Sequence, residues 1–204
     1  MSPMISRGFR RKHSDVGSGA VPPGQYVTGD FPVLSAGPTP RTSTATWSFT
    51  LQDLDGKEFF RWEWSDLLAL PASQITVDIH CVTKWTKLGT RWKGVSFDAL
   101  IAAAGQPLPG SHVMAYCDGG YTTNLAVADL EGGKGMIAYE YDGSPLAPEH
   151  GGPARLLVPH LYFWKSAKWV RGLRFMAADA PGFWEALGYH RRGDPWKEQR
   201  YDGD

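Results

Sequence analysis

Residues 75–85 read Ile-Thr-Val-Asp-Ile-His-Cys-Val-Thr-Lys-Trp, an alternating segment that runs into a polar, aromatic one. Successive side chains of a β-strand point to opposite faces, so residues 75, 77, 79 and 81 share an apolar face. Asp78 and His80 fall on the other face. We therefore predict a strand over residues 75–81, with Cys81 at its end and on its apolar side, followed by a polar loop.

Cys81 allows two interpretations from this stretch alone. Lys84, Lys87 and Arg91 follow it in the sequence, and nearby cations favour the thiolate form of a cysteine. A free cysteine is more often a small, buried hydrophobic residue. The local sequence favours the second interpretation, and more distant motifs are needed to decide.

Three blocks of sequence resemble one known family. Cys81 is followed by Trp85 and by Arg-Trp-Lys-Gly-Val at 91–95, which looks like the cysteine segment of the sulfite oxidase family, the mononuclear molybdenum enzymes. His-Gly-Gly-Pro-Ala-Arg at 150–155, with Lys-Ser-Ala-Lys-Trp at 165–169, resembles the pterin-binding motif of the same family. Phe-Pro-Val at 31–33, with Trp47 and Gly56 after it, resembles the family's first block. The blocks keep the family's order over most of the chain.

The resemblance implies a molybdenum-molybdopterin cofactor and an oxidoreductase that transfers an oxygen atom at molybdenum. The reaction would be a sulfite-type oxidation or the reduction of an S-oxide or N-oxide. In the family one protein thiolate joins the cofactor's sulfurs on the metal, and Cys81 matches that position; thiolate is a soft donor suited to such a centre. The motif implies that the cofactor is bound by His150, Arg155, Ser166, Ala167 and Lys168. Arg155 and Lys168 would contact the pterin and its phosphate. Ser166 and Ala167 would offer backbone N–H groups.

Three further residues are candidates for the substrate side of the site. Asp118 begins the polar turn Asp-Gly-Gly-Tyr-Thr-Thr at 118–123, which resembles a family segment near the metal, although an ordinary surface turn would have the same composition. Lys84 and Arg91 follow Cys81 closely. From that position we predict that either could attract a small oxyanion or oxide substrate.

Short strands and few helices, separated by long loops, predict a mixed α+β domain. The resemblance implies a β-rich, sulfite oxidase-type molybdopterin-binding domain with short peripheral helices. Alternation predicts a hairpin of strands 47–51 and 58–62 around Asp55-Gly56, and the other predicted strands are 113–117, 136–141, 155–158 and 169–176. Ser65 and Ser96 are predicted N-caps, and the predicted helices are 66–70, 97–104 and 125–130.

Composition excludes several classes of protein. The 204 residues carry 21 Lys and Arg against 21 Asp and Glu, a formal net charge of zero, so the basic excess of a nucleic-acid-binding protein is missing. No apolar run has the length of a membrane span, and no apolar signal segment follows the basic N-terminal residues. We expect a cytoplasmic protein with a flexible basic arm at 1–24 and a molybdopterin-binding oxidoreductase domain at 25–204.

Two other functions stay open at this stage. A non-catalytic carrier of the molybdenum cofactor would keep Arg155 and Lys168 and need no substrate site. A cysteine hydrolase would need a histidine base beside Cys81. His80 points to the opposite face of the predicted strand, so the base would have to come from His112, His150 or His160.

Electrons must enter or leave through a partner if the resemblance holds. Oxygen-atom transfer moves two electrons at the metal. Neither a Cys-x-x-Cys-His haem attachment nor a cysteine set for an iron–sulfur cluster occurs among the two cysteines, and we expect neither haem nor flavin. We therefore expect a separate electron-transfer partner, docking near residues 84–92.

Overall fold

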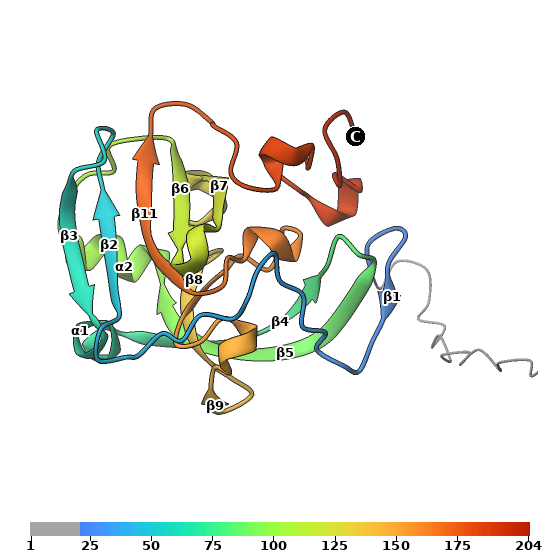
Figure 1. Cartoon of the computed structure of the whole chain (residues 1–204), viewed down its shortest axis with the longest axis horizontal. Helices are drawn as coiled ribbons and strands as arrows, with labels where there is room; N and C mark the ends of the chain where they lie inside the picture. Colours follow the sequence, from blue (N-terminus) through green and yellow to red (C-terminus); the bar gives the residue numbers. More distant parts are fainter. Residues whose placement is uncertain (1–20) are drawn as a thin grey trace, which may run out of the picture.

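The computed structural model describes residues 21–204. Most of the arm expected at 1–24 lies outside these residues, so that expectation stays a prediction. The described chain consists mainly of β-strands in two mixed sheets, with two α-helices and several short 3-10 turns (Figure 1). The expected β-rich α+β class with short peripheral helices is confirmed.

The first sheet carries the residues that will form one wall of the candidate site. Its central path runs through β1 (Tyr26–Val27), β5 (Trp85–Ser96), β8 (Met136–Tyr141) and β10 (Arg155–Leu157). Two more strands extend it, since β4 (Ala72–His80) pairs with β5 and β9 (Ser144–Pro145) pairs with β8. All pairs are antiparallel except β1–β5.

The second sheet has five strands in the order β3 (Glu58–Glu63), β2 (Ser48–Gln52), β11 (Val170–Met176), β6 (His112–Cys117) and β7 (Thr122–Ala126). The hairpin β2–β3 turns at the predicted Asp55-Gly56, where Gly56 has a φ of +79°. This sheet brings together early and late parts of the chain, because the late strand β11 pairs in parallel with the early strand β2.

The two helices are short. Helix α2 (Phe97–Ala104) follows its predicted signals, because the Ser96 hydroxyl accepts the Ala99 N–H at 3.1 Å and Gly105 ends the helix in the left-handed region. Helix α1 (Trp64–Ala69) starts earlier than predicted. Its cap is Glu63 rather than Ser65, and the Glu63 N–H donates to the Asp66 carboxylate at 2.9 Å.

Two sequence-based elements are wrong. The loop predicted after Cys81 is β5, the longest strand of the described chain. Its polar composition is typical of a loop. It is a strand because its backbone groups pair with β4 on one side and with β8 on the other. The helix predicted at 125–130 is instead the end of β7 and the 3-10 turn η2 (Val127–Asp129).

The sheets enclose one large core and border a second one. The larger cluster includes Trp47 and Phe49 of β2, Leu100 of α2 and Ile137 of β8, all almost fully buried, and it therefore lies between the sheets. The smaller cluster contains Ile79, Cys81, Trp85 and Trp92, with Phe163. Cys81 thus belongs to the second core, on the far side of the first sheet from the main one.

The segment after β11 folds back over the body, and Figure 1 shows it crossing toward the β1 end of the first sheet. It contains the 3-10 turns η5 (Glu185–Leu187) and η6 (Pro195–Lys197) and one isolated bridge between Tyr189 and Tyr201. Arg200, near its end, donates to the Val82 carbonyl at 2.7 Å. This tail therefore contacts the turn that carries Cys81.

Candidate functional site

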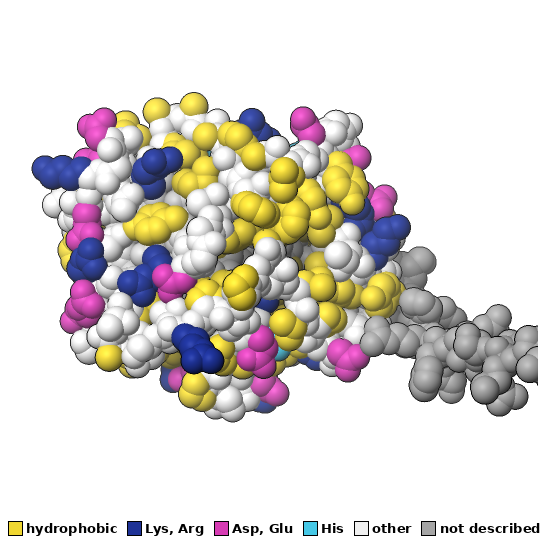
Figure 2. Space-filling model, in the orientation of Figure 1, with side chains coloured by type: hydrophobic (Ala, Val, Ile, Leu, Met, Phe, Trp, Pro, Cys, Tyr) yellow, Lys and Arg dark blue, Asp and Glu magenta, His cyan; other side chains and the backbone are white. Residues whose placement is uncertain are grey.

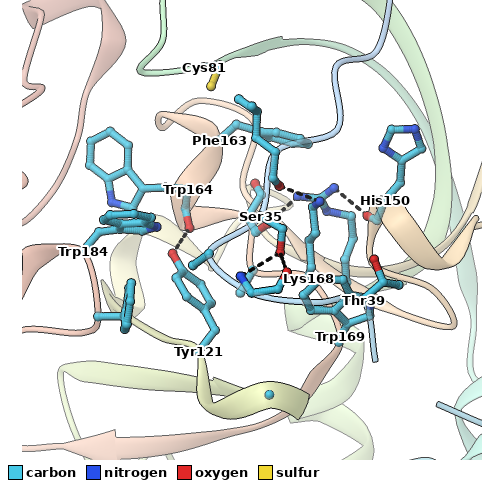
Figure 3. A pocket seen from close by; sticks show the side chains of 18 of the residues that line it. Ser35, Thr39, Cys81, Tyr121, His150, Phe163, Trp164, Lys168, Trp169 and Trp184 are labelled. Atoms are coloured by element: carbon cyan, nitrogen blue, oxygen red, sulfur yellow. Dashed lines mark hydrogen bonds between the residues drawn. The ribbon is translucent and has the colours of Figure 1, made fainter. Parts of the chain in front are cut away.

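A cavity of about 640 Å³ opens between the first sheet and the tail. Five parts of the chain that are distant in sequence line it: residues 31–40, the turn at 81–85, the segments 118–121 and 150–169, and the tail at 183–189. Apolar side chains dominate the face shown in Figure 2, and Figure 3 shows the interior of the cavity. Cys81, Asp118, His150, Arg155, Ser166, Ala167 and Lys168 all line it, so seven of the nine predicted site residues meet there.

Cys81 occupies the tight turn between β4 and β5. Its N–H donates to the Trp85 carbonyl at 2.8 Å, and its carbonyl accepts from Lys84, whose φ is +75°. The Thr83 hydroxyl donates to Cys81 Sγ at 3.1 Å. The turn therefore fixes the sulfur at the cavity wall, where Figure 3 shows it at the upper edge.

The surroundings of Cys81 agree with the interpretation that the local sequence favoured, a buried cysteine. Burial raises the pKa of the thiol, and the Thr83 hydrogen bond and the positive charge of Arg200 oppose that shift only in part. Lys84, Lys87 and Arg91, the cations of the alternative interpretation, are not among the groups that shift it. In the protein alone Cys81 is thus a protonated thiol at neutral pH, and a metal would have to displace its proton.

Arg155 is the most unusual residue of the cavity. Its side chain is 1% exposed, and its guanidinium donates to the carbonyls of His150 (2.8 Å) and Ser166, while Nε has no partner. The charge lies over Phe163, 4.1 Å from the ring centroid. No ion pair between Arg155 and a carboxylate is found within residues 21–204.

A buried cation without a counter-charge is costly. Burial lowers the pKa of Arg155 from its ordinary 12.5 to about 9. Because the unpaired Nε belongs to a residue that lines the cavity, an anion bound there would supply both the missing charge and the missing acceptor.

His150 and Lys168 lie beside Arg155. The His150 ring stacks on Phe31 at 3.8 Å between centroids, and its buried Nδ1 has no partner. Burial, together with the charges of Arg155 and Lys168, lowers the pKa of His150, so the ring is neutral at pH 7. Burial and the charge of Arg155 also lower the pKa of Lys168 to about 8. Lys168 Nζ donates to the carbonyls of Leu34 (2.7 Å) and Glu149 (2.6 Å).

The breaker-rich loop before β10 explains how these three side chains meet. A Cβ at Gly152 would lie 2.0 Å from the Leu146 carbonyl oxygen, so only glycine fits. Gly151 has a φ of +108°, and a Cβ there would press on Lys168 and Arg155 at 3.0–3.1 Å. The two glycines therefore allow the loop to pack directly against the cationic side chains.

The remaining predicted residues take up different roles in the lining. Ser166 does not offer a free backbone N–H, because that group donates to the Phe163 carbonyl at 3.1 Å, and its hydroxyl accepts from Val158 N–H at 2.8 Å. The Ala167 carbonyl accepts from the Leu156 N–H at 2.9 Å. Asp118 accepts from the Thr42 hydroxyl at 2.6 Å and faces Arg171 at 3.7 Å.

Lys84 and Arg91 lie outside the cavity. Arg91 is on β5, with 62% of its side chain exposed, and pairs with Asp142 at the end of β8. Lys84 is exposed at the β4–β5 turn and is not part of the lining. Their placement gives no support to the substrate-binding role predicted for them, because alternation along β5 directs Arg91 away from buried Trp92.

Sequence reasoning missed the aromatic residues of the tail. Phe183, Trp184 and Tyr189 line the cavity together with Trp164. The sequence showed aromatic anchors in this stretch, but it gave no sign that they would reach the cavity. A buried ion pair between Lys165 and Glu185, 2.6 Å apart, was also unforeseen.

Comparison with known proteins now identifies the family. Residues 36–184 match the family model described as oxidoreductase molybdopterin binding domain. This chain belongs to that family of molybdopterin-binding oxidoreductases. The resemblance seen in the sequence is thereby confirmed.

Three curated relatives show how similar this chain is to individual members of the family. It is 44% identical over 189 residues to the uncharacterised oxidoreductase YuiH of Bacillus subtilis, covering 92% of this chain and 94% of YuiH. It is 30% identical over 130 residues to the Azospira oryzae protein named, provisionally, protein-methionine-sulfoxide reductase subunit YedZ1, covering 63% of this chain and 49% of that one. It is 22% identical over 180 residues to human mitochondrial sulfite oxidase, of which the match covers only 33%.

A solved structure shows the same fold. The sulfane dehydrogenase SoxCD from Paracoccus pantotrophus superposes with a TM-score of 0.60 at 23% identity, covering 69% of this chain and 40% of that one. Neither helix of the described residues has the length and apolar composition that a membrane crossing would need.

Proposed function

We propose that the protein is a molybdopterin-dependent oxidoreductase that transfers an oxygen atom at a molybdenum bound to Cys81. The single observation that carries the proposal is the pairing, in one cavity, of a buried guanidinium without a counter-anion and a cysteine thiol. The first demands an anionic ligand, and the second offers a soft metal donor. A phosphate-bearing cofactor with a sulfur-bound metal satisfies both.

The residues present fit such a cofactor. Arg155 would bind its phosphate or pterin through the unpaired Nε, and Lys168 would add a point charge beside it. The neutral His150 ring would bind a pterin nitrogen through the unpartnered Nδ1. Trp85 Nε1 is a further buried donor without a partner in the lining. A bound cofactor would therefore supply hydrogen-bond partners for three buried polar atoms that have none in the protein alone.

The cofactor supplies the oxygen-atom and electron chemistry when bound. The contribution of this chain is to bind, orient and shield it. Cys81 would hold the metal from the rigid β4–β5 turn, and Thr83, which donates to Sγ at 3.1 Å, would keep the sulfur oriented. The aromatic lining would exclude water from the reacting atoms.

The reaction direction is either sulfite-type oxidation or reduction of an S-oxide or N-oxide. The names of the relatives include both a sulfite oxidase and a sulfoxide reductase. In either direction two electrons cross between the metal and a partner, so the proposal includes a separate electron-transfer partner. The compartment we propose is the cytoplasm.

Dye-linked turnover of the Cys81→Ser variant tests the proposal. We expect the variant to fold and to lose oxygen-atom transfer almost completely, because a hard alkoxide or water replaces a soft thiolate. Cys117→Ser is the matched control: Cys117 is also buried, but it lies outside the cavity, so this variant should keep its turnover. Full turnover in Cys81→Ser would refute the assignment.

A further inference from the structure

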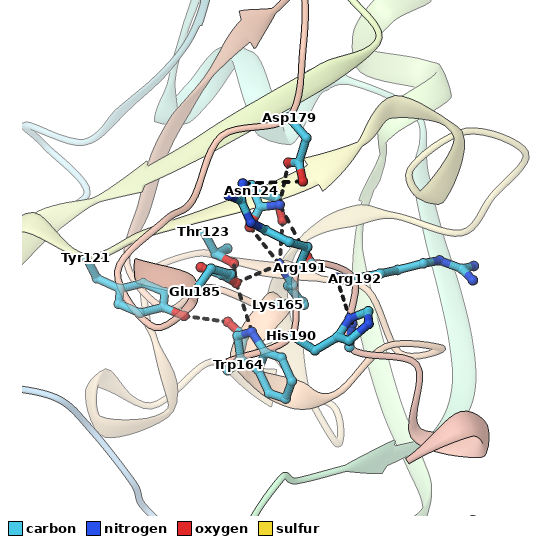
Figure 4. A network of polar contacts seen from close by, with 11 residues as sticks. Tyr121, Thr123, Asn124, Trp164, Lys165, Asp179, Glu185, His190, Arg191 and Arg192 are labelled. Atoms are coloured by element: carbon cyan, nitrogen blue, oxygen red, sulfur yellow. Dashed lines mark hydrogen bonds and ion pairs between the residues drawn. The ribbon is translucent and has the colours of Figure 1, made fainter. Parts of the chain in front are cut away.

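Most walls of the cavity are held by strand pairing or by buried contacts. The turn of Cys81 joins the paired strands β4 and β5, and the segment 118–121 joins the paired strands β6 and β7. The loop at 150–155 packs closely through its two glycines and leads into β10. The tail is fixed by the buried polar network of Figure 4, in which Glu185 accepts from Lys165 Nζ at 2.6 Å. These walls are therefore formed before any ligand arrives.

The remaining wall consists of residues 31–42, which we call the strap. Figure 1 shows it as part of the blue segment that crosses the molecule between β1 and β2. Within residues 21–204 the strap makes no hydrogen bond between its backbone and another backbone group. Pro32, Pro38 and Pro40 have no N–H to donate. The strap is therefore the part of the lining that lacks the support of secondary structure.

Three contacts attach the strap to the body. At its start the Phe31 ring packs against the second core. At its end the Thr42 hydroxyl donates to the Asp118 carboxylate at 2.6 Å. Between them the Leu34 carbonyl accepts from Lys168 Nζ at 2.7 Å. The middle of the strap is thus held by a cation that lines the cavity.

Lys168 couples the strap to a ligand in the cavity. An ammonium group has three N–H donors, and Nζ gives two of them to the carbonyls of Leu34 and Glu149. The third can bind an anion held at Arg155. Burial and the charge of Arg155 lower the pKa of Lys168, whereas a bound anion would favour the charged form, which also holds the strap. Anion binding and closure of the strap therefore favour each other.

We propose that the strap opens to admit an anionic ligand and closes over it, by breaking and remaking the contacts of Leu34 and Thr42 while Phe31 stays packed. The inference rests on the proposed function for the identity of the ligand, a phosphate-bearing cofactor. A cavity of about 640 Å³ buries most of a small ligand, so one wall must move for the ligand to enter. Val33 and Leu34 are already 51% and 49% exposed, so opening the strap costs little apolar burial.

Cleavage by trypsin after Arg41 measures how often the strap opens. Arg41 is an exposed residue of the strap, and a protease cuts a segment that opens locally. Cleavage there should be at least about tenfold faster in cofactor-free protein than in protein of measured molybdenum and pterin content. Cleavage after Lys57, exposed in the β2–β3 turn outside the cavity, is the internal control and should not change. Mass spectrometry of the fragments distinguishes the two sites.

Thr42→Val tests the strap without changing the cavity lining. The variant keeps the shape of the side chain and removes the hydroxyl that donates to Asp118, and Thr42 itself lies outside the lining. The loaded variant should release pterin about five- to tenfold faster than wild type, because opening no longer breaks this bond. Pterin in the ultrafiltrate, followed over time, measures the release. Thr46→Val is the matched control, since the Thr46 hydroxyl donates to the Ser43 carbonyl beyond the strap, and it should release pterin at the wild-type rate.

The outcomes separate this inference from the proposed function. Equal cleavage after Arg41 in loaded and cofactor-free protein would overturn the strap and leave the proposed function standing, and so would wild-type pterin release from Thr42→Val. Protein that never acquires molybdenum would instead overturn the proposed function. The strap is then tested with inorganic pyrophosphate, which should slow cleavage after Arg41 by binding at Arg155 and Lys168. Cleavage that pyrophosphate leaves unchanged would overturn the strap as well.

Discussion

At the residue scale, Arg155 is the residue of the cavity that most needs an anionic ligand. It is buried without a counter-charge, has an unpaired Nε and lines the cavity. Arg155→Met keeps much of the side-chain volume and removes the charge. Loss of a charge-assisted hydrogen bond costs about 1.5–3 kcal/mol, so we expect cofactor affinity to fall about ten- to a hundredfold. Pterin released by acid and quantified by fluorescence measures this.

Folding is a separate question in that experiment. Since Met also removes a buried charge that has no counter-charge, the free energy of unfolding should stay within about 2 kcal/mol of wild type. Lys168→Met should lower cofactor content in the same way. Arg91→Met removes a surface cation outside the cavity and should leave cofactor content unchanged. If both cavity variants keep full occupancy, these residues do not bind the cofactor.

The lowered pKa of Lys168 predicts that anion binding in the cavity depends on pH. Its folded-state pKa is lowered to about 8, so Lys168 is charged below that pH and neutral above it. Affinity of cofactor-free protein for inorganic pyrophosphate should therefore fall as pH rises from 7 to 9, and titration calorimetry can follow it. In Lys168→Met the affinity should be lower throughout and should fall less steeply over this range, because the remaining pH dependence comes from Arg155, whose pKa is about 9. A wild-type affinity that is constant from pH 7 to 9 would contradict the assignment.

At the element scale, the tail depends on one buried ion pair. The side chains of Lys165 and Glu185 are both 0% exposed, and Glu185 also accepts from Thr123 and Trp164. Glu185→Gln leaves the Lys165 charge buried without its ion-pair carboxylate, with the Asn124 oxygens as its remaining acceptors, which costs about 3–5 kcal/mol. Urea unfolding should show this loss. The control Glu58→Gln removes the charge of an exposed, distant ion pair with Arg61 and should cost under about 1 kcal/mol; a similar small loss for Glu185→Gln would mean that the pair does not hold the tail.

The elements show where sequence reasoning succeeds and where it stops. Helix α2 was predictable because its signals are local: Ser96 caps it and Gly105 ends it. Strand β5 was not, because its polar sequence resembles a loop and the pairing with β4 and β8 that makes it a strand is non-local. The charged neighbours of Cys81 could not be found in the sequence for the same reason. Arg91 points away along β5, while Arg200 arrives from the far end of the chain.

The motif residues of the site were predictable, whereas the aromatic residues that the tail contributes to the cavity were not. His150, Arg155 and Lys168 belong to one motif whose glycine-rich spacing demands close packing. Phe183, Trp184 and Tyr189 have no such local pattern. They reach the cavity because contacts with distant residues hold the tail against the body, among them the buried pair of Glu185 with Lys165, and a single carboxylate in a sequence does not reveal that it will be buried.

At the scale of the whole molecule, the proposal requires electrons from outside this chain. We predict that the purified protein lacks a haem Soret band and a flavin band and turns over with artificial dyes alone. Strand β5 offers Lys87 near the turn of Cys81, and Lys93 lies further along the strand, paired with Glu140. Charge reversal at both should slow turnover driven by a cell extract more than dye-linked turnover. A Soret or flavin band, or equal effects on both rates, would contradict the prediction.

The most direct test of the central claim is the metal and pterin content of the purified protein. Protein produced in cells that load a control molybdenum enzyme should contain about one molybdenum and one pterin per chain, because the cavity offers one thiolate and one set of anion-binding groups. Elemental mass spectrometry and pterin fluorescence measure the two. Protein free of both, from cells in which the control enzyme is fully loaded, would contradict the assignment of this cavity.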